Sequence, residues 1–103
     1  MKILDLILTN KWYDMTLSGE KTEEYREITD YWCRRICHVK TYCRCYPPCN
    51  KVPTNITHVR LHRGYTNTTM LKEVESIITG IGNPAWGAPD RETFIIKYKP
   101  NNQ

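Results

Sequence analysis

The chain has 103 residues, of which 40% are hydrophobic and 25% are charged, and its formal net charge is +4. These values predict one soluble globular domain with a modest core, and the longest apolar run is far too short for a transmembrane helix. Asp5 interrupts the apolar segment at the N-terminus, which argues against a signal peptide and predicts a cytoplasmic protein with no membrane partner.

The first twenty residues predict a strand followed by a helix. Residues 3–8 are mostly apolar and favour a buried strand. Thr9 or Asn10 can cap a helix that continues to about Ser18, because both side chains accept hydrogen bonds from the first helical turn. Gly19 is expected to end this helix, since glycine tolerates the left-handed backbone conformation that follows a helix.

The rest of the sequence predicts a second short helix and further strands. The charged run 21–27 follows Gly19 closely and favours a strand, and Thr29 can cap a helix over 30–37. Residues 38–55 are expected to be an irregular, Cys-rich basic excursion. Mixed apolar parity within 69–81 indicates a β-bulge. Three later strands are expected at 56–62, 69–81 and 93–98, which gives an α+β fold with a small curled sheet.

Positive charge is concentrated in the middle of the chain. Residues 31–72 contain eight Lys or Arg and all three His but no acidic residue. Such a stretch produces a positive field that attracts phosphate groups, although a solvated basic face without a ligand has the same composition. The cations expected to hold a nucleic-acid backbone are Arg34, Arg35, Lys40, Arg44, Lys51 and Arg63.

A short charged pattern provides the most specific signal. Residues 19–26 contain Gly-x-Lys-x-x-Glu-x-Arg, with Gly19, Lys21, Glu24 and Arg26 at the defined positions. Together with the helix before it, the later segment 82–89 and the closing strand, this pattern resembles the ASCH domain over most of the chain outside 38–55. The resemblance implies a single domain over residues 1–103, with a PUA-like small β-barrel and two short helices. It also implies a cleft that binds RNA or a modified nucleoside or nucleotide.

The chemistry of these residues supports a binding site. On a strand, Thr22, Glu24 and Arg26 share one face. The planar guanidinium of Arg26 suits a phosphate or a base edge, and Glu24 can accept from an exocyclic amine or orient Arg26. Lys21 reaches the same cleft only if the chain after Gly19 is irregular. An ion-pair network that holds the barrel mouth together is the structural alternative. The expected ligand-binding residues are Lys21, Thr22, Glu24, Arg26, Arg60 and Trp86.

Two other functions remain open. Some small ASCH proteins resemble amidohydrolases that act on acetylated cytidine nucleosides, and there a lysine at the Lys21 position activates a threonine. This chain has Glu24 at the threonine position, and Thr22 lies about 7 Å away along a strand. A catalytic variant would use Glu24 as a general base and Lys21 to stabilise an oxyanion. The third alternative is a protein-interaction module with a basic face.

Aromatic residues are candidates for base stacking, which contributes about 1–3 kcal/mol per base. Trp12 and Trp32 have helical core spacing, so the core is their expected place. Trp86 lies in a Gly- and Pro-rich loop, where it either lines the cleft or packs beneath the loop. Tyr42 and Tyr46 lie among basic residues, as is typical of single-stranded nucleic-acid binding.

No cofactor and no metal ion is predicted, and a monomer is the simplest expectation for the oligomeric state. His58 and His62 would lie about 13 Å apart on a strand and cannot share a zinc ion. Reduced thiols are favoured for the five cysteines, with a disulfide or a tetrahedral zinc site as alternatives. The zinc ligands would come from Cys33, Cys37, Cys43, Cys45 and Cys49.

Overall fold

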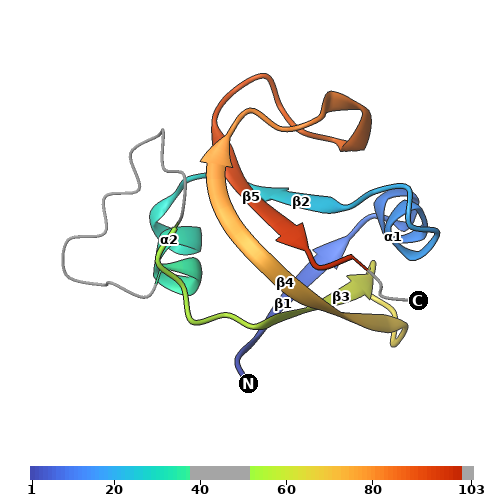
Figure 1. The fold of residues 1–103 in the computed structure, drawn as a ribbon. Coiled ribbons are helices and arrows are strands. Elements are labelled where there is room, and N and C mark those ends of the chain that lie inside the picture. Colours follow the sequence, from blue (N-terminus) through green and yellow to red (C-terminus); the bar gives the residue numbers. More distant parts are fainter. Residues whose placement is uncertain (38–51, 101–103) are drawn as a thin grey trace.

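The computed structural model describes residues 1–37 and 52–100. These residues form a small α+β domain in which a five-stranded sheet curls into a half-barrel (Figure 1). The strands are β1 (Ile3–Leu8), β2 (Glu23–Arg26), β3 (His58–Arg63), β4 (Thr69–Gly80) and β5 (Thr93–Tyr98). The helices are α1 (Asn10–Leu17) and α2 (Asp30–Ile36), with a 3-10 turn, η1 (Pro84–Trp86), between β4 and β5. The predicted α+β class with a curled sheet and two short helices is therefore confirmed.

The strand order β1-β3-β4-β5-β2 leaves β1 and β2 at the two open edges of the sheet. β1 pairs with β3 in parallel, and all other neighbours are antiparallel. The first part of β4 pairs with β3 and the second part with β5, with a shift in register between Val74 and Ser76. This shift is the bulge predicted within 69–81, and it bends the strand so that the two halves of the sheet face each other.

Local signals set the ends of the helices. Gly19 follows α1 with a φ of 89°, which is the left-handed conformation expected of it. The Thr29 side chain accepts a hydrogen bond from the Trp32 amide and caps α2, as predicted. The predicted strand at 21–27 is shorter than expected, because β2 begins only at Glu23. The amide of Lys21 still donates to the Met15 carbonyl of α1, at 3.0 Å, and this holds the residue outside the strand. Among the described residues, no helix has the length and apolar character needed to span a membrane.

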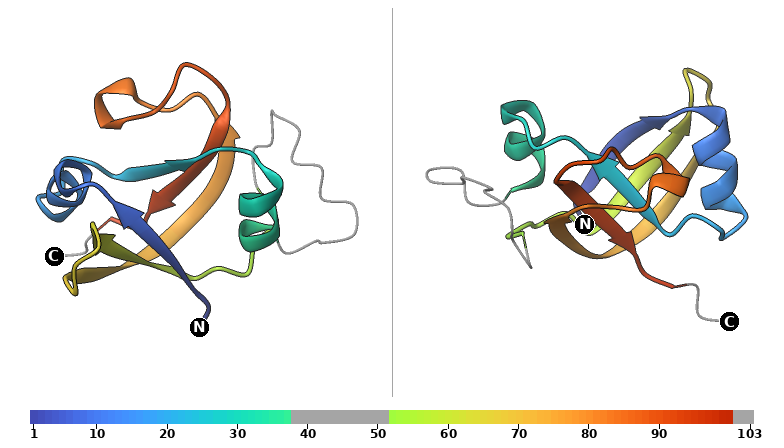
Figure 2. Two further views of the ribbon diagram at one scale, coloured as in Figure 1. Left: turned by 180° about the vertical axis from the view of Figure 1, so that it is seen from behind. Right: turned by 90° about the horizontal axis from the view of Figure 1, so that it is seen from above.

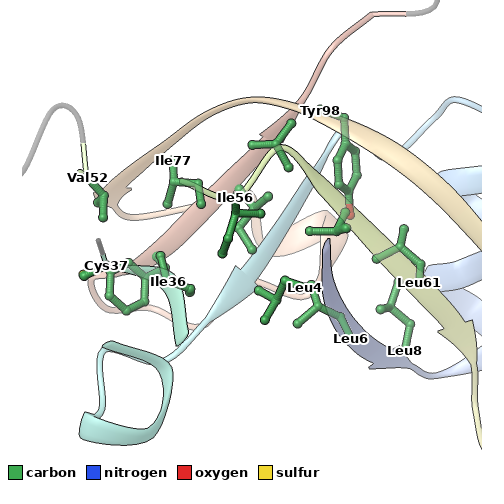
Figure 3. Packing of buried hydrophobic residues seen from close by; sticks show 14 of the residues in the cluster. Leu4, Leu6, Leu8, Ile36, Cys37, Val52, Ile56, Leu61, Ile77 and Tyr98 are labelled. Carbon is green, nitrogen blue, oxygen red and sulfur yellow. The ribbon is translucent and has the colours of Figure 1, made fainter. Parts of the chain in front are cut away.

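The two faces of the sheet carry different clusters. The inner face holds the main core, in which Leu4, Tyr98 and Leu61 point into the same interior space (Figure 3). The outer face of β2 and β5 holds a smaller cluster that includes Tyr25 and Ile95. The helices lie at opposite ends of the half-barrel in each view (Figure 2). Since Glu24 pairs with Ile96 and Arg26 with Phe94, both charged residues share the inner face with core residues.

The loop after β4 packs closely against the outer cluster at Gly82. A Cβ added to this glycine would lie 2.7 Å from Cδ1 and Cζ of Tyr25. We therefore expect Gly82→Ala to lower the free energy of unfolding by about 1–3 kcal/mol, because the tyrosine ring has to move. Urea denaturation followed by tryptophan fluorescence measures this change.

Gly80→Ala is the matched control, because its Cβ would meet only the Ile95 side chain, at 3.5 Å, an ordinary contact. We expect this variant to stay within about 1 kcal/mol of the wild type. Equal losses in both variants would contradict the proposed packing of Gly82 on Tyr25.

Candidate functional site

The candidate site lies where the sheet fails to close, between the open edges of β1 and β2. The carbonyls of Lys2 and Leu8 accept hydrogen bonds from the β3 side, and backbone groups alternate along a strand. The carbonyl of Ile7 therefore points to the open edge of β1. On β2, the carbonyl of Thr22 accepts from Tyr98 of β5, so the carbonyls of the odd-numbered positions face the open edge. We call this gap between the two edges the seam.

Three charged side chains meet at the seam. Lys21 Nζ forms an ion pair with Glu24 Oε1, and Arg26 Nη1 forms one with Glu24 Oε2, with N–O distances of 2.6 Å in both pairs. The side chains are 0% exposed for Lys21, 7% for Glu24 and 18% for Arg26. One buried carboxylate thus bridges two cations, and the cluster carries a formal charge of +1. Ion pairs this deeply buried are costly unless their remaining donors are satisfied.

The two cations also satisfy the open strand edges. Lys21 Nζ donates to the Glu23 carbonyl, and Arg26 Nη1 donates to the Tyr25 carbonyl at 2.8 Å. Arg26 Nη2 donates across the seam to the Ile7 carbonyl, at 3.2 Å. A single guanidinium therefore connects β2 with β1 through groups that lack a neighbouring strand. In this geometry the three charged side chains hold the two strand edges together, which is the structural alternative to a binding site.

Burial changes the acid–base behaviour of three residues near the seam. Desolvation lowers the pKa of Lys21, although the negative charge of Glu24 acts in the opposite direction. Desolvation raises the pKa of the Tyr25 hydroxyl, which donates to Glu23 Oε1 at 2.9 Å and accepts from the Asn83 amide at 3.1 Å. Burial also raises the pKa of Tyr98, with the charge of Glu24 adding to the effect. The Tyr98 hydroxyl has no hydrogen-bond partner within residues 1–37 and 52–100.

A cavity of about 490 Å³ lies along the seam and is lined by residues of both edge strands and both helices. We call it the seam hollow, and its volume is in the range of small-molecule sites. It is lined by Asp5, Ile7, Leu8, Thr9, Trp12, Glu24, Arg26, Tyr31 and Trp32.

A second cavity of about 490 Å³ adjoins the first, because the two share Asp5, Tyr31 and Trp32. We call it the basic hollow, since three of its lining residues are Lys or Arg and one is acidic. It is lined by Lys2, Ile3, Leu4, Asp5, Tyr31, Trp32, Arg34 and Arg35.

The two aromatic rings that both hollows share lie between two guanidinium groups, one from each hollow. Arg26 Cζ lies 5.3 Å from the centre of the Trp32 ring, and Trp32 meets Tyr31 edge to face with ring centres 4.9 Å apart. Arg35 Cζ lies 3.5 Å from the centre of the Tyr31 ring. Contacts of this kind hold both the rings and the cations in place, which preorganises the wall for a flat ligand.

Comparison with known proteins assigns no family to this chain. No protein-family model matches it, and no curated protein or solved structure matches it. The function has therefore to be inferred from the residues of the seam and of the two hollows.

The six predicted ligand-binding residues do not all lie at one place. Glu24 and Arg26 line the seam hollow, and Lys21 is buried behind them in contact with Glu24. Thr22 precedes β2 and is exposed, so it lies outside the lining of both hollows. Trp86 packs against the outer cluster around Tyr25, on the other face of the sheet. Arg60 lies on the outer face of β3 and pairs with Asp5 at 3.2 Å, apart from the charged cluster.

The predicted phosphate-binding cations also lie in different parts of the molecule. Arg34 and Arg35 line the basic hollow. Arg63 lies outside both hollows and forms a two-pronged ion pair with Asp14, with both N–O distances 3.0 Å. Lys40, Arg44 and Lys51 fall outside the described residues.

The predicted cysteine site is only partly described. Cys33 is half-buried against the main core and Cys37 is buried within it. Within the described ranges, no group of three or more metal-ligating side chains occurs. Cys43, Cys45 and Cys49 lie outside the described residues, so the zinc alternative stays open.

Sequence reasoning missed Asp5 and underestimated two tryptophans. Their spacing predicts a place in the core for Trp12 and Trp32, and both pack against it while they also line the seam hollow. Tyr31, which is among the aromatic residues that the sequence offers for base stacking, is 53% exposed and lines both hollows. Asp5 gave no signal, because its role depends on β1 being an edge strand.

The ion cluster predicts the effect of removing its central charge. We expect Glu24→Gln to lower the free energy of unfolding by about 3–5 kcal/mol, because Lys21 would remain buried without its counterion. Thermal and urea unfolding measure this effect. Glu20→Gln is the control, since Glu20 is exposed and lies in the bend between α1 and β2. A loss below about 1 kcal/mol for Glu24→Gln would contradict a structural role for the cluster.

The buried Tyr98 hydroxyl predicts an effect of pH. Its pKa is raised in the folded state, so above pH 10 the folded chain binds more protons than the unfolded chain, and stability falls as pH rises. Each pH unit removes up to about 1.4 kcal/mol through this residue. We expect Tyr98→Phe to be at least as stable as the wild type at pH 7 and to lose stability less steeply above pH 10. Parallel urea-denaturation series at pH 7 to 11 measure both effects, and identical alkaline slopes would contradict the assignment.

Proposed function

We propose that this chain is an ASCH-type domain with a PUA-like fold that binds RNA or a nucleotide-like ligand at the seam. The observation that carries the proposal is the seam hollow, which combines Arg26, Glu24 and three aromatic side chains in one cavity. Bases present flat apolar faces and a polar edge, and these two features suit aromatic rings and a guanidinium group. The curled sheet and the Gly-x-Lys-x-x-Glu-x-Arg pattern at its seam support the family assignment.

The neighbouring charges support a phosphate-containing ligand. Lys2, Arg34 and Arg35 line the basic hollow, which shares a wall with the seam hollow. Guanidinium groups bind phosphate through paired hydrogen bonds, and two arginines at the end of α2 would hold a backbone that leaves the seam. A ligand that occupies both hollows would carry aromatic and anionic parts, which is the composition of a nucleotide.

The described contacts favour binding over threonine-dependent acyl hydrolysis. The Lys21 ammonium is fully buried, and its described hydrogen bonds go to the Glu23 carbonyl and the Glu24 carboxylate, neither of which is a hydroxyl. Thr22 is exposed before the strand and does not line the seam hollow. A nucleophile must lie within hydrogen-bond reach of its base. We accordingly expect no acetate release from acetylated cytidine, and measurable release would favour the enzymatic alternative.

Salt dependence tests the binding proposal. We expect a fluorescently labelled single-stranded RNA to bind with an affinity that falls steeply between about 50 and 200 mM salt, because phosphate contacts release counterions. Arg34→Ala/Arg35→Ala should weaken binding at least about tenfold and reduce the slope of log K against log salt by about 1.4. Fluorescence anisotropy measures both quantities.

The control for this experiment is Arg91→Ala/Lys99→Ala. It removes two exposed cations that pair with Glu27 and Glu73 and that lie outside both hollows. We expect a smaller change in affinity for this variant, because it removes the same amount of positive charge without changing the lining of either hollow. An affinity that does not depend on salt, or equal losses of affinity in the two double variants, would contradict the proposed interface.

A further inference from the structure

The two hollows together narrow the class of ligand. We infer that they hold one unstacked nucleotide, with its base in the seam hollow and its phosphate at Arg34 and Arg35 in the basic hollow. This inference rests on the proposed function and goes beyond it, since it specifies a monomeric binding unit, its orientation and the residues that hold each part. Three observations carry it: the open backbone of β1, the fixed position of Arg35 and the distribution of acidic groups.

The open edge of β1 provides polar groups for the edge of a base. Ile7 presents its carbonyl to the seam, as its hydrogen bond from Arg26 Nη2 demonstrates. Asp5 lies two residues earlier, so its backbone N–H and C=O point in the same direction. A donor and an acceptor side by side complement the paired donor and acceptor on the hydrogen-bonding edge of a base. Asp5 also lines both hollows, which places this edge at their shared wall.

The cations of the basic hollow are prepared for an anion. Arg35 stacks on Tyr31, and its Nη1 donates to the Tyr31 carbonyl at 3.1 Å, so its guanidinium is held before any ligand arrives. A group that is already ordered loses less conformational entropy on binding. Arg34 is exposed next to it in the last turn of α2. Both arginines line the basic hollow, and guanidinium groups bind phosphate through paired hydrogen bonds.

The orientation follows from the position of the acidic groups. Glu24 lines the seam hollow and is paired with Arg26 at 2.6 Å, so a phosphate placed there would face a carboxylate. The Asp5 carboxylate is occupied on the outer face, where Oδ1 contacts Arg60 at 3.2 Å and His62 at 2.8 Å. The base therefore occupies the aromatic hollow and the phosphate the cationic one. A cavity of about 490 Å³ accepts a base only after it has left its stack, which excludes a paired duplex.

Titrations with mononucleotides test this inference. The wild-type chain is titrated with the four ribonucleoside 5′-monophosphates, the four 3′-monophosphates, the matching nucleosides and inorganic phosphate. Quenching of tryptophan fluorescence reports binding, because Trp12 and Trp32 line the seam hollow. We expect at least one monophosphate to bind about tenfold or more tightly than its nucleoside, since charge-assisted hydrogen bonds to the phosphate add to base stacking.

Variants test which hollow binds the phosphate and which binds the base. In Arg34→Ala/Arg35→Ala, the monophosphate should bind no more tightly than the nucleoside, so the ratio of the two affinities falls to about one. Arg63→Ala is a control, because Arg63 is held by Asp14 outside both hollows, and it should preserve the advantage of the monophosphate. Tyr31→Ala should weaken both ligands and Tyr31→Phe should restore the nucleoside, because only the ring is needed for stacking. Circular dichroism confirms that each variant is folded.

The outcomes separate the inference from the proposed function. If single-stranded RNA binds but no monophosphate exceeds its nucleoside, or if the advantage survives the loss of both arginines, the inference is overturned and the proposed function stands. The same holds if RNA binds while no mononucleotide binds at all. If neither RNA nor any nucleotide binds, the inference and the proposed function both fail. Binding of inorganic phosphate alone, without any gain from a base, would also overturn the inference.

Discussion

Backbone carbonyls at the open edges of β1 and β2 need hydrogen-bond donors, and two cations held by one buried carboxylate supply them. Glu24 fixes Lys21 and Arg26 at 2.6 Å each, and those two side chains reach the carbonyls of Glu23, Tyr25 and Ile7. This arrangement crosses the gap between the two edges and borders the cavity there. An apolar cluster of the same volume could fill the space, but it could not donate to the carbonyls.

The same constraint explains why the site lies where it does. Charged groups on the inner face prevent the core from extending to the seam, so the aromatic side chains of both helices border a cavity instead of closing it. Arg26 belongs both to the architecture and to the proposed binding surface, so a variant at this position mixes the two effects. Arg34 and Arg35 lie on α2, outside the charged cluster, and they separate ligand binding from the integrity of the sheet.

Much of the fold could be predicted because its signals are local. The cap at Thr29, the left-handed Gly19 and the mixed parity within 69–81 each identified a feature of the structure. The order of the strands could not be predicted, since the parallel pairing of β1 with β3 joins residues about half the chain apart. That order decides which residues border the seam. The sequence therefore indicated the pairing of Glu24 with its cations, but it could not show that Arg60 and Trp86 lie outside the lining of both hollows.

The bulge between Val74 and Ser76 has a consequence for ligand size. β4 changes partner at this point, and it is the strand through which the β1–β3 half of the sheet is joined to the β5–β2 half. The bend at the bulge therefore sets the angle between the two halves and the width of the gap along their free edges. One residue inserted or deleted here would turn the rest of β4 over and expose the buried Ile77. The dimensions of the cavity are thus set by a strand that supplies none of its lining residues.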